Sequence, residues 1–326
     1  MNQGLSIRYS TTNHIRTLDL RRDLGKVADL IEVCFPLHLD PDGQSYVKEM
    51  RKSARDMHLM GWLGQLVELG NKKATGFVWE EDGRIIGNLS LIPFKFNNHR
   101  FHMIANVAVH PEHREQGIAR SLTQCALAYL RRINERRAWL QVRDDNLAAI
   151  HLYRSFGFVG RAVRTSWRIR PKDINMSKKN PDIHILIRYR HKSDWNLQKT
   201  LLAKNYPVEL RWNLPVNFQR FSPGFFQTTV NVLDGLFLKH WAVERDSKLE
   251  GVITWQKTSS FTNNLWLALP EETEGETLPR ALVNICKKIS GRHPITVDYP
   301  NARCKTQFEN LGFIPFRTLI WMECKL

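Results

Sequence analysis

The feature that most constrains the fold is an internal repeat, in which three stretches of the first half recur in the second half in the same order. They are Glu81–Gly87 with Arg245–Gly251, Val107–Glu112 with Leu267–Glu271, and the set Asn146, Tyr153, Gly157-Phe158 with Asn301, Phe308, Gly312-Phe313. The third pair has identical internal spacing in both copies. We therefore interpret the chain as two copies of one fold.

The domain organisation follows from the repeat and from the length of 326 residues, which suits two domains of about 100–200 residues each. A polar stretch with two prolines, residues 171–182, separates the copies. We expect an N-terminal domain over 1–172, a linker over 173–182 and a C-terminal domain over 183–326. The predicted fold class is α/β (α+β): two tandem domains, each a mixed, mostly antiparallel sheet flanked by helices.

Local patterns place the elements of the first copy. Apolar residues at helical spacing predict helices over 22–35 and within 44–60, and Asp82-Gly83 between two apolar runs predicts a hairpin. We expect a strand over 103–109, a helix opening at Gly117 and a strand over 138–142. Asn146 is suited to cap the next helix, and Gly157 to end it.

A short loop after strand 103–109 leads directly into a helix. The exposed N–H groups of a helix N-terminus bind phosphate, and Gly117 lets an anion approach the backbone closely. Ala119 keeps a second position small, while Arg114 and Arg120 add positive charge. The alternative is an ordinary glycine-containing loop before an amphipathic helix.

Two motifs carry a resemblance to a known family. Arg114-x-x-Gly117-x-Ala119 resembles the Q/R-x-x-G-x-G/A signature of the GNAT superfamily of N-acetyltransferases. Asn146-x-x-Ala149-x-x-x-Tyr153-x-x-x-Gly157-Phe158 resembles the late helix of that family and the turn after it. The resemblance covers roughly residues 12–170 and includes the order of the preceding elements.

The resemblance implies acetyl-CoA, or a related acyl-CoA, as the cofactor. It implies that backbone groups of the strand Val107, Ala108, Val109 pair with the pantetheine arm, near the point where the fourth and fifth strands splay apart. It also implies a pyrophosphate cradle in the loop and the first helical turn. The cradle residues are Arg114, Glu115, Gln116, Gly117, Ile118, Ala119, Arg120 and Ser121. Asn146 fits both a cofactor contact and a plain helix cap.

The catalytic groups are also implied by the resemblance. Tyr153 matches the general acid of the family, since a phenol can protonate the departing thiolate. Its alternative is a packing aromatic, because it shares a helical stripe with neighbouring apolar residues. Many members carry an acidic base on the fourth strand, but the corresponding stretch here, Ile104-Ala105-Asn106-Val107, has none; Asn106 could orient a water but cannot take the proton. The base is therefore open: water to Glu80 or a nearby carboxylate, or an amine that arrives neutral.

The second copy matches the family weakly. Its loop, residues 270–277, carries four glutamates and no basic residue, and carboxylates would repel a pyrophosphate. Phe308 replaces the tyrosine and lacks a hydroxyl. We expect this copy to have kept the fold and lost the chemistry, with a structural role.

The sequence predicts an N-acetyltransferase acting by direct attack of a primary amine in a ternary complex. The acceptor, a small molecule or a peptide, is not identified, and neither is the oligomeric state. The formal net charge of +16 leaves an alternative, a nucleic-acid-associated protein that binds or acetylates RNA, motivated by Arg131-Arg132, Arg136-Arg137 and residues 188–192. An ordinary solvated face is the other explanation for these clusters, and we favour it. A third class is a non-catalytic acyl-CoA-binding protein.

Further sequence patterns limit the localisation, the metal content and the pocket of the protein. No run reaches the ~18–20 apolar residues of a membrane span, and the N-terminus shows no signal-peptide core, so we expect a cytoplasmic protein. The five scattered cysteines lack CxxC spacing, and His110-x-x-His113 contains a proline in a loop setting, so no metal site is expected. The aromatics Trp62, Trp79, Trp212, Phe225 and Phe226 could line the acceptor pocket, but we expect most of them in the cores.

Overall fold

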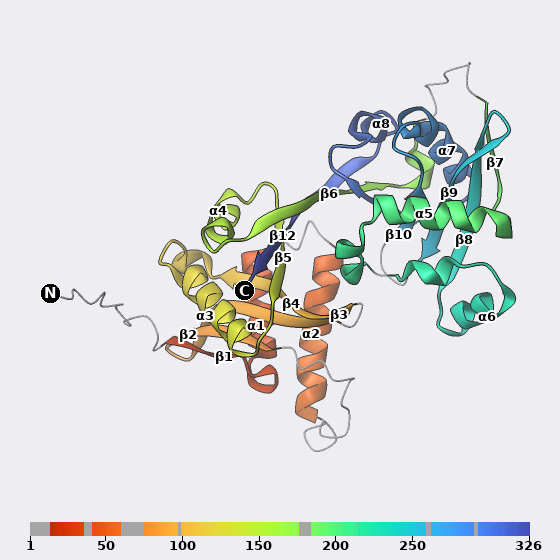
Figure 1. Ribbon diagram of the computed structural model, residues 1–326. Coiled ribbons are helices and arrows are strands. Elements are labelled where there is room, and N and C mark those ends of the chain that lie inside the picture. The colour runs from red at the N-terminus through yellow and green to blue at the C-terminus, as the bar shows by residue number, and fades with distance from the viewer. Residues whose placement is uncertain are drawn as a thin grey trace. The chain divides into compact units, whose positions relative to one another are not determined.

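The computed structural model describes residues 14–35, 41–59, 75–96, 99–175, 184–214, 216–258, 262–289 and 293–326. By its contacts the chain divides into two compact units (Figure 1). Unit 1 comprises Met1–Arg161 together with Trp321–Leu326, and unit 2 comprises Ala162–Ile320. The expected linker 173–182 lies largely outside the described residues.

The elements of the first half alternate as the patterns predict. They are β1 (Ile15–Thr17), α1 (Leu20–Cys34), α2 (Pro41–Leu59), β2 (Thr75–Glu81), β3 (Arg84–Phe96), β4 (His99–Val109), α3 (Ile118–Arg132), β5 (Arg137–Arg143), α4 (Leu147–Ser155) and β6 (Val159–Ile169). The hairpin turn is at Asp82 and Gly83, which both adopt positive φ as a tight two-residue hairpin requires.

The second half contains a matching series. Its elements are β7 (Ile185–Tyr189), α5 (Trp195–Asn205), α6 (Phe225–Leu233), β8 (Phe237–Arg245), β9 (Lys248–Lys257), β10 (Asn263–Ala268), α7 (Glu274–Lys288), β11 (Ile295–Pro300), α8 (Lys305–Asn310) and β12 (Ile314–Lys325). The fold class predicted from the sequence, mixed sheets flanked by helices in both halves, is confirmed.

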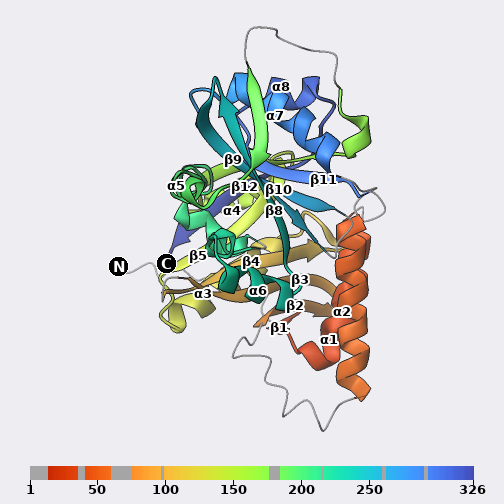
Figure 2. The same cartoon turned by 90° about the vertical axis from the view of Figure 1, so that its right-hand side faces the viewer.

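The sheet of unit 1 has the order β1-β2-β3-β4-β5, antiparallel except for the parallel pair β4 and β5. Helices α1 and α2 lie on one side of it and α3 on the other (Figure 2). The predicted apolar face of α1 is buried: Val27, Ala28 and Ile31 pack with Val78 and Ala108. Alternating strand residues thus divide between two helical layers.

The end of β12 completes unit 1. Trp321, Met322 and Cys324 are buried, and the backbone N–H of Leu326 donates to the carbonyl of Arg136 across 3.1 Å. The carboxylate of Glu323, 5% exposed, lies between Arg137 and Arg161. A segment distant in sequence therefore belongs to the hydrophobic layer of the first unit.

Unit 2 has the strand order β11-β10-β9-β8-β7, and residues 164–169 of β6 pair antiparallel with β11. Leu278, Leu282 and Ile285 of α7 pack in one core, and Leu201 and Leu202 of α5 pack in another. The repeat is visible in the backbone, because β10 and β11 are parallel over three residue pairs, just as β4 and β5 are. A 15-residue helix follows each of β4 and β10.

Candidate functional site

The candidate site begins where β4 leaves β5. The parallel register runs from His102 with Ala138 to Ile104 with Leu140, whereas β4 continues to Val109. The region from Val107 to Val109 therefore extends beyond the ladder that joins the two strands. Its side chains alternate: Ala108 is buried against α1, while Val107 and Val109 are half-buried.

The carbonyl of Val109 already has protein donors. The Cys34 thiol donates to it across 3.1 Å and Arg114 Nε across 3.3 Å. Because a carbonyl oxygen has two lone pairs, these two donors fill its capacity. Arg114 is thus held against the strand end, where its positive charge also opposes the effect of burial, which raises the pKa of the Cys34 thiol.

The loop after β4 is shaped by left-handed residues. A 3-10 turn over Pro111–His113 leads to Glu115 with φ 63° and Gly117 with φ 80°. Gly117 is the N-cap of α3 and no side chain caps this helix, so the N–H groups of its first turn point outward without a side-chain acceptor. Gly117, Glu115 and Gln116 are exposed, whereas Ile118 is buried. The helix opening predicted at Gly117 is confirmed.

The second predicted arginine, Arg120, faces α4. Its Nη2 donates to the Ser155 hydroxyl across 3.1 Å, and its guanidinium lies 5.3 Å from the ring centre of Phe156. The loop and α4 are therefore joined by this side chain. Ala119 and Ser121 are half-buried on the first turn of the same helix.

Helix α4 carries Asn146 and Tyr153. The predicted cap is confirmed, since Asn146 Oδ1 accepts from the Ala149 N–H across 3.1 Å, which leaves its Nδ2 to donate elsewhere. The Tyr153 ring is 6% exposed and packs edge-to-face on Phe158. Among the described residues no hydrogen bond reaches its hydroxyl. Burial raises the pKa of Tyr153, so the phenol stays protonated at neutral pH.

A bulge in β4 places a polar group that sequence reasoning did not connect to any partner. The register of β3 and β4 shifts between Asn88 and Ser90, and Asn106 sits in the bulge with φ 51°. Asn106 Nδ2 donates to the hydroxyl of Tyr46 on α2 across 2.8 Å. A bulge can be suspected from Asn within an apolar strand, but its partner, sixty residues away, cannot.

Glu80, the carboxylate that could receive the amine proton through water, is already paired with two arginines. It accepts from Arg16 Nε and, across 2.6 Å, from Arg22 Nη2. The Arg16 hydrogen bond leads the effects that lower the pKa of Glu80. A carboxylate held between two guanidinium groups is a weak base, so this alternative loses its physical support.

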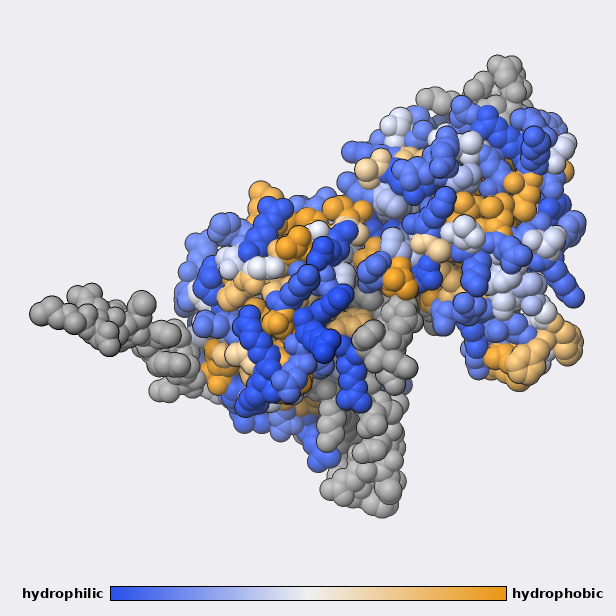
Figure 3. All heavy atoms as spheres, viewed as in Figure 1, coloured by the Kyte–Doolittle hydropathy of each residue, from blue (hydrophilic) through white to orange (hydrophobic). Residues whose placement is uncertain are grey.

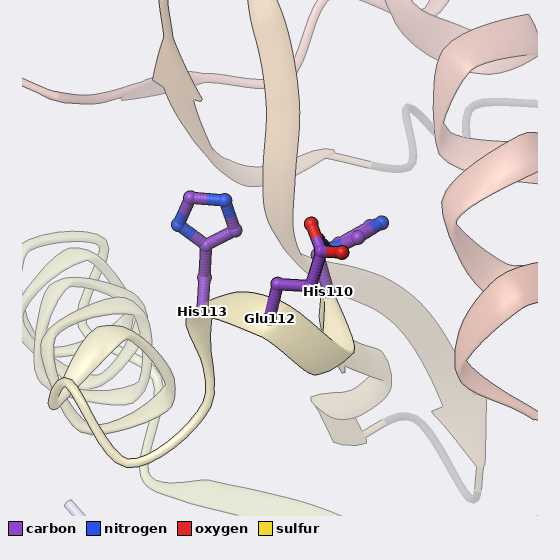
Figure 4. Close-up of side chains that lie close together, drawn as sticks. All are labelled: His110, Glu112 and His113. Carbon is purple, nitrogen blue, oxygen red and sulfur yellow. Dashed lines mark ion pairs between the residues drawn. The ribbon is translucent and has the colours of Figure 1, made fainter.

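His110, Glu112 and His113 lie on the turn after β4 (Figure 4). One potential ligand atom of each lies within 4.8 Å of the others, and Glu81 Oε2 is 3.8 Å from His113 Nδ1. The Glu112 side chain is 83% exposed. All three residues belong to one short turn and its first flanking residue, so local geometry alone brings them together.

The corresponding helix start in unit 2 is closed by its own side chains. Glu274, the first residue of α7, is buried; it accepts from Arg303 Nε across 2.7 Å and from the hydroxyl of Tyr299. The N-cap there is Thr273 in right-handed conformation. Phe308 is fully buried between Trp167 and Tyr299. An anion at this helix start would meet a buried carboxylate.

The two basic clusters differ in how many of their arginines are free to bind a polyanion such as RNA. Arg131, Arg132 and Arg136 are exposed. In the second cluster, by contrast, Arg188 binds Asp194 and Glu244 across 2.7 and 2.6 Å. Arg190 donates to Gln198 and to the carbonyl of Phe221. These internal partners leave little of the second cluster for a polyanion.

The surface adds two observations. Phe225 and Phe226 are 89% and 80% exposed on α6, so these two of the five aromatics do not belong to a core; this helix forms an apolar patch in Figure 3. Trp79 is buried, as expected, and Trp62 lies outside the described residues. In the part of the chain that the structure describes, no helix combines the length and apolar character that crossing a bilayer requires.

Comparison with known proteins agrees with this geometry. The model of the acetyltransferase (GNAT) family matches residues 29–158. The mycothiol acetyltransferase of Geodermatophilus obscurus is 42% identical over 62 residues, which are 19% of this chain and 20% of that enzyme. The chain thus matches only a fifth of the length of this curated relative.

Solved structures extend the likeness to the whole fold. The structure of a GCN5-related N-acetyltransferase from Sphaerobacter thermophilus aligns with 96% of this chain over 96% of its own length, with a TM-score of 0.58 and 13% sequence identity. A tandem GNAT protein from the clavulanic acid biosynthesis pathway covers 95% of this chain and 98% of its own, with a TM-score of 0.50 and 14% identity. GNAT proteins use acetyl-CoA. Residues 29–158 thus match the GNAT acetyltransferase family, and the chain as a whole has the fold of tandem GNAT proteins.

Proposed function

We propose that this protein is an N-acetyltransferase that transfers the acetyl group of acetyl-CoA to a primary amine by direct attack in a ternary complex. One observation carries the proposal: a left-handed Gly117 opens α3 without a side-chain cap, directly after a strand that extends beyond its ladder with β5. A strand edge beside an uncapped helix start suits a ligand with a pyrophosphate and an extended amide-containing arm.

The residues present fit such a ligand. A Cβ built at Gly117 would meet no atom within 4 Å, so the backbone is open at the point where a phosphate would lie. The cradle would be formed by Arg114, Glu115, Gln116, Gly117, Ile118, Ala119, Arg120 and Ser121, and the strand Val107, Ala108, Val109 would pair with the arm. The Val109 carbonyl already accepts from Cys34 and Arg114, so the hydrogen bonds between the strand and the pantetheine arm rely mainly on Val107. If Arg114 turns toward the pyrophosphate, the Val109 carbonyl gains a free lone pair for the arm. Asn146 Nδ2 is a further donor.

Bound acetyl-CoA supplies an activated acetyl thioester. The amine nitrogen forms a bond to the acetyl carbon and the carbon–sulfur bond breaks; the nitrogen loses a proton to water, the sulfur gains one from an acid of the protein, and that acid recovers its proton from the solvent. We assign the proton donor to Tyr153, whose raised pKa keeps it protonated and whose neighbour Phe158 fixes the ring. With Glu80 bound by arginines, the amine is expected to arrive neutral.

We further propose that residues 1–172 hold the catalytic site and that 183–326, joined through 173–182, form a degenerate copy without an acyl-CoA site. The buried Glu274 at the start of α7 and the buried Phe308 support this assignment. The nucleic-acid alternative loses the support of Arg188 and Arg190, which have internal partners, and keeps that of the exposed Arg131, Arg132 and Arg136.

The test is calorimetric titration with acetyl-CoA. We expect about one site per chain, lost in Gly117→Glu, which places a carboxylate at the cradle. The matched control is Gly235→Glu, because Gly235 also has positive φ (67°) and open space but lies in unit 2. Two sites per chain would overturn the proposal that the second copy has no acyl-CoA site. No binding by the parent chain would overturn the function and direct attention to RNA at low salt.

A further inference from the structure

Asn106 is the polar residue at the bend of β4. Its positive φ of 51° is a conformation that asparagine and aspartate tolerate better than other side chains do. Asn88, fully buried, donates through Nδ2 to the Asn106 carbonyl across 2.7 Å and also reaches Ser90 Oγ at 3.2 Å. The bulge is therefore held from within the sheet, and the side chain of Asn106 is directed by a fixed backbone.

The Asn106 amide is oriented by its partner. Because Nδ2 donates to the Tyr46 hydroxyl at 2.8 Å, Oδ1 remains as the accepting end of the amide. The Tyr46 oxygen has a second lone pair besides the one that accepts from Asn106. Tyr46 is 42% exposed, and Asn106 is half-buried, so solvent-borne molecules can reach the pair. Two neighbouring oxygen acceptors thus stand beside the strand proposed to hold the acyl donor.

We propose that Asn106 Oδ1 and the Tyr46 hydroxyl oxygen bind the acceptor as a neutral primary amine; this inference rests on the proposed function. A neutral primary amine has two N–H donors and one lone pair. Two acceptors engage both donors and leave the lone pair directed at the acetyl carbon. A secondary amine offers one N–H, so the pair selects for primary amines. An uncharged amide and phenol provide no anion to hold an ammonium ion.

With a neutral amine as the reactant, the pH dependence of kcat/KM is set by the acceptor and not by a group of the enzyme. No acidic residue occurs from Ala105 to Val109, and Glu80 is bound by Arg16 and Arg22. Without an enzymatic base, the fraction of neutral amine sets the rate, and kcat/KM rises with pH through the pKa of the amine itself. Asn106→Asp keeps the shape and tolerates the positive φ, yet supplies a carboxylate that can accept the proton.

The kinetic experiment measures CoA release with three amines of increasing basicity as probes: glycinamide, ethanolamine and propylamine. In the parent chain the pH midpoint of kcat/KM should follow that order. In Asn106→Asp the midpoint should become independent of the amine, and the rate at neutral pH should rise about tenfold or more. Tyr46→Phe should raise the KM for amine by up to about tenfold and leave acetyl-CoA affinity unchanged. Asn134→Asp, another asparagine of positive φ (59°), is the matched control.

A second readout does not depend on turnover. In protein with ¹⁵N-labelled asparagine, the Nδ2 resonance of Asn106, assigned by its loss in Asn106→Asp, should shift when ethanolamine is added above the amine's pKa. It should shift much less below that pH. If the parent chain does not bind acetyl-CoA, the proposed function is wrong. Retained acetyl-CoA binding with an unmoved Asn106 resonance, or with a pH midpoint common to all three amines, would overturn the role of Asn106 and Tyr46 alone.

Discussion

Gly87 of β3 lies directly against Ile118, the first residue of α3. A Cβ built at Gly87 would stand 2.8 Å from Ile118 Cγ2, 3.1 Å from Trp79 Cβ and 3.2 Å from Leu122 Cδ1. The first of these distances is shorter than real Cβ contacts and the other two are tight, so an added Cβ would push against the side chains of α3. The start of α3, and with it the proposed pyrophosphate cradle, is therefore packed closely on Gly87.

Gly87→Ala should consequently weaken acetyl-CoA binding without altering any residue of the loop. Overpacking of this kind costs about 1–3 kcal/mol and would move the helix start away from the sheet. Calorimetry and thermal unfolding measure the two effects. Gly25→Ala in α1, where an added Cβ meets nothing within 4 Å, is the control and should be neutral or slightly stabilising. Unchanged affinity in Gly87→Ala would show that the cradle does not depend on this contact.

Tyr153→Phe isolates the hydroxyl from the packing of its ring. The variant keeps the edge-to-face contact with Phe158, so folding and acetyl-CoA affinity should be preserved. Loss of the proton donor should lower kcat by about 10²–10⁴-fold. Steady-state kinetics with propylamine measures this, and Tyr129→Phe on α3 is the matched control. A kcat equal to that of the parent chain would reduce Tyr153 to a packing role.

His240 makes unit 2 sensitive to acid. Burial lowers its pKa to about 3, the nearby Arg190 guanidinium acts in the same direction, and its Nδ1 lies 2.8 Å from Thr254 Oγ1. The folded state keeps the ring neutral, whereas the unfolded state takes up a proton below the ordinary value of 6.5. Stability contributed by the neutral ring is thus present above pH 6.5 and lost as the pH falls toward about 3.

His240→Gln should flatten this loss, which reaches at most about 1.4 kcal/mol per pH unit for one proton. Glutamine can keep a hydrogen bond to Thr254. Unfolding midpoints of both proteins between about pH 8 and about pH 4 provide the measurement. If the two proteins lose stability equally over this interval, other groups govern the acid response.

Removal of Trp321–Leu326 should unfold unit 1 although the proposed site lies elsewhere in the sequence. The deletion exposes the pockets of Trp321 and Met322, each worth about 1.5–3 kcal/mol when buried. It also leaves Arg137 and Arg161 without Glu323. Loss of acetyl-CoA binding together with cooperative unfolding is expected. Removal of Lys325 and Leu326 alone is the milder control, and full binding by the larger deletion would contradict the role of this segment.

Much of the architecture could be predicted because it depends on local patterns. The hairpin at Asp82-Gly83, the helix opening at Gly117 and the cap at Asn146 each follow from residue types in a short window, and each is confirmed. The two copies differ in one detail. Asn301 stands where Asn146 stands in the repeat, but α8 begins after Cys304, and Asn301 Oδ1 accepts from the Thr165 hydroxyl.

What escaped prediction is long-range. The Asn106–Tyr46 hydrogen bond depends on a bulge that shifts the register by one residue, and no periodic pattern encodes its partner. The binding of Glu80 by Arg16 and Arg22 depends equally on tertiary packing. Hydrophobicity favours a core position for most of the aromatics, but it does not predict that α6 leaves Phe225 and Phe226 exposed.

The place of Trp321–Leu326 in unit 1 has a consequence for biosynthesis. A ribosome must translate all of residues 162–320 after the first unit has emerged before the completing strand becomes available. At about 5–20 residues per second this delay amounts to roughly 10–30 s. During that time the nascent first unit carries an unpaired edge at β5, the kind of edge that invites aggregation. The first unit is thus made first and finished last, and its open β5 edge is exposed to other chains between the two events.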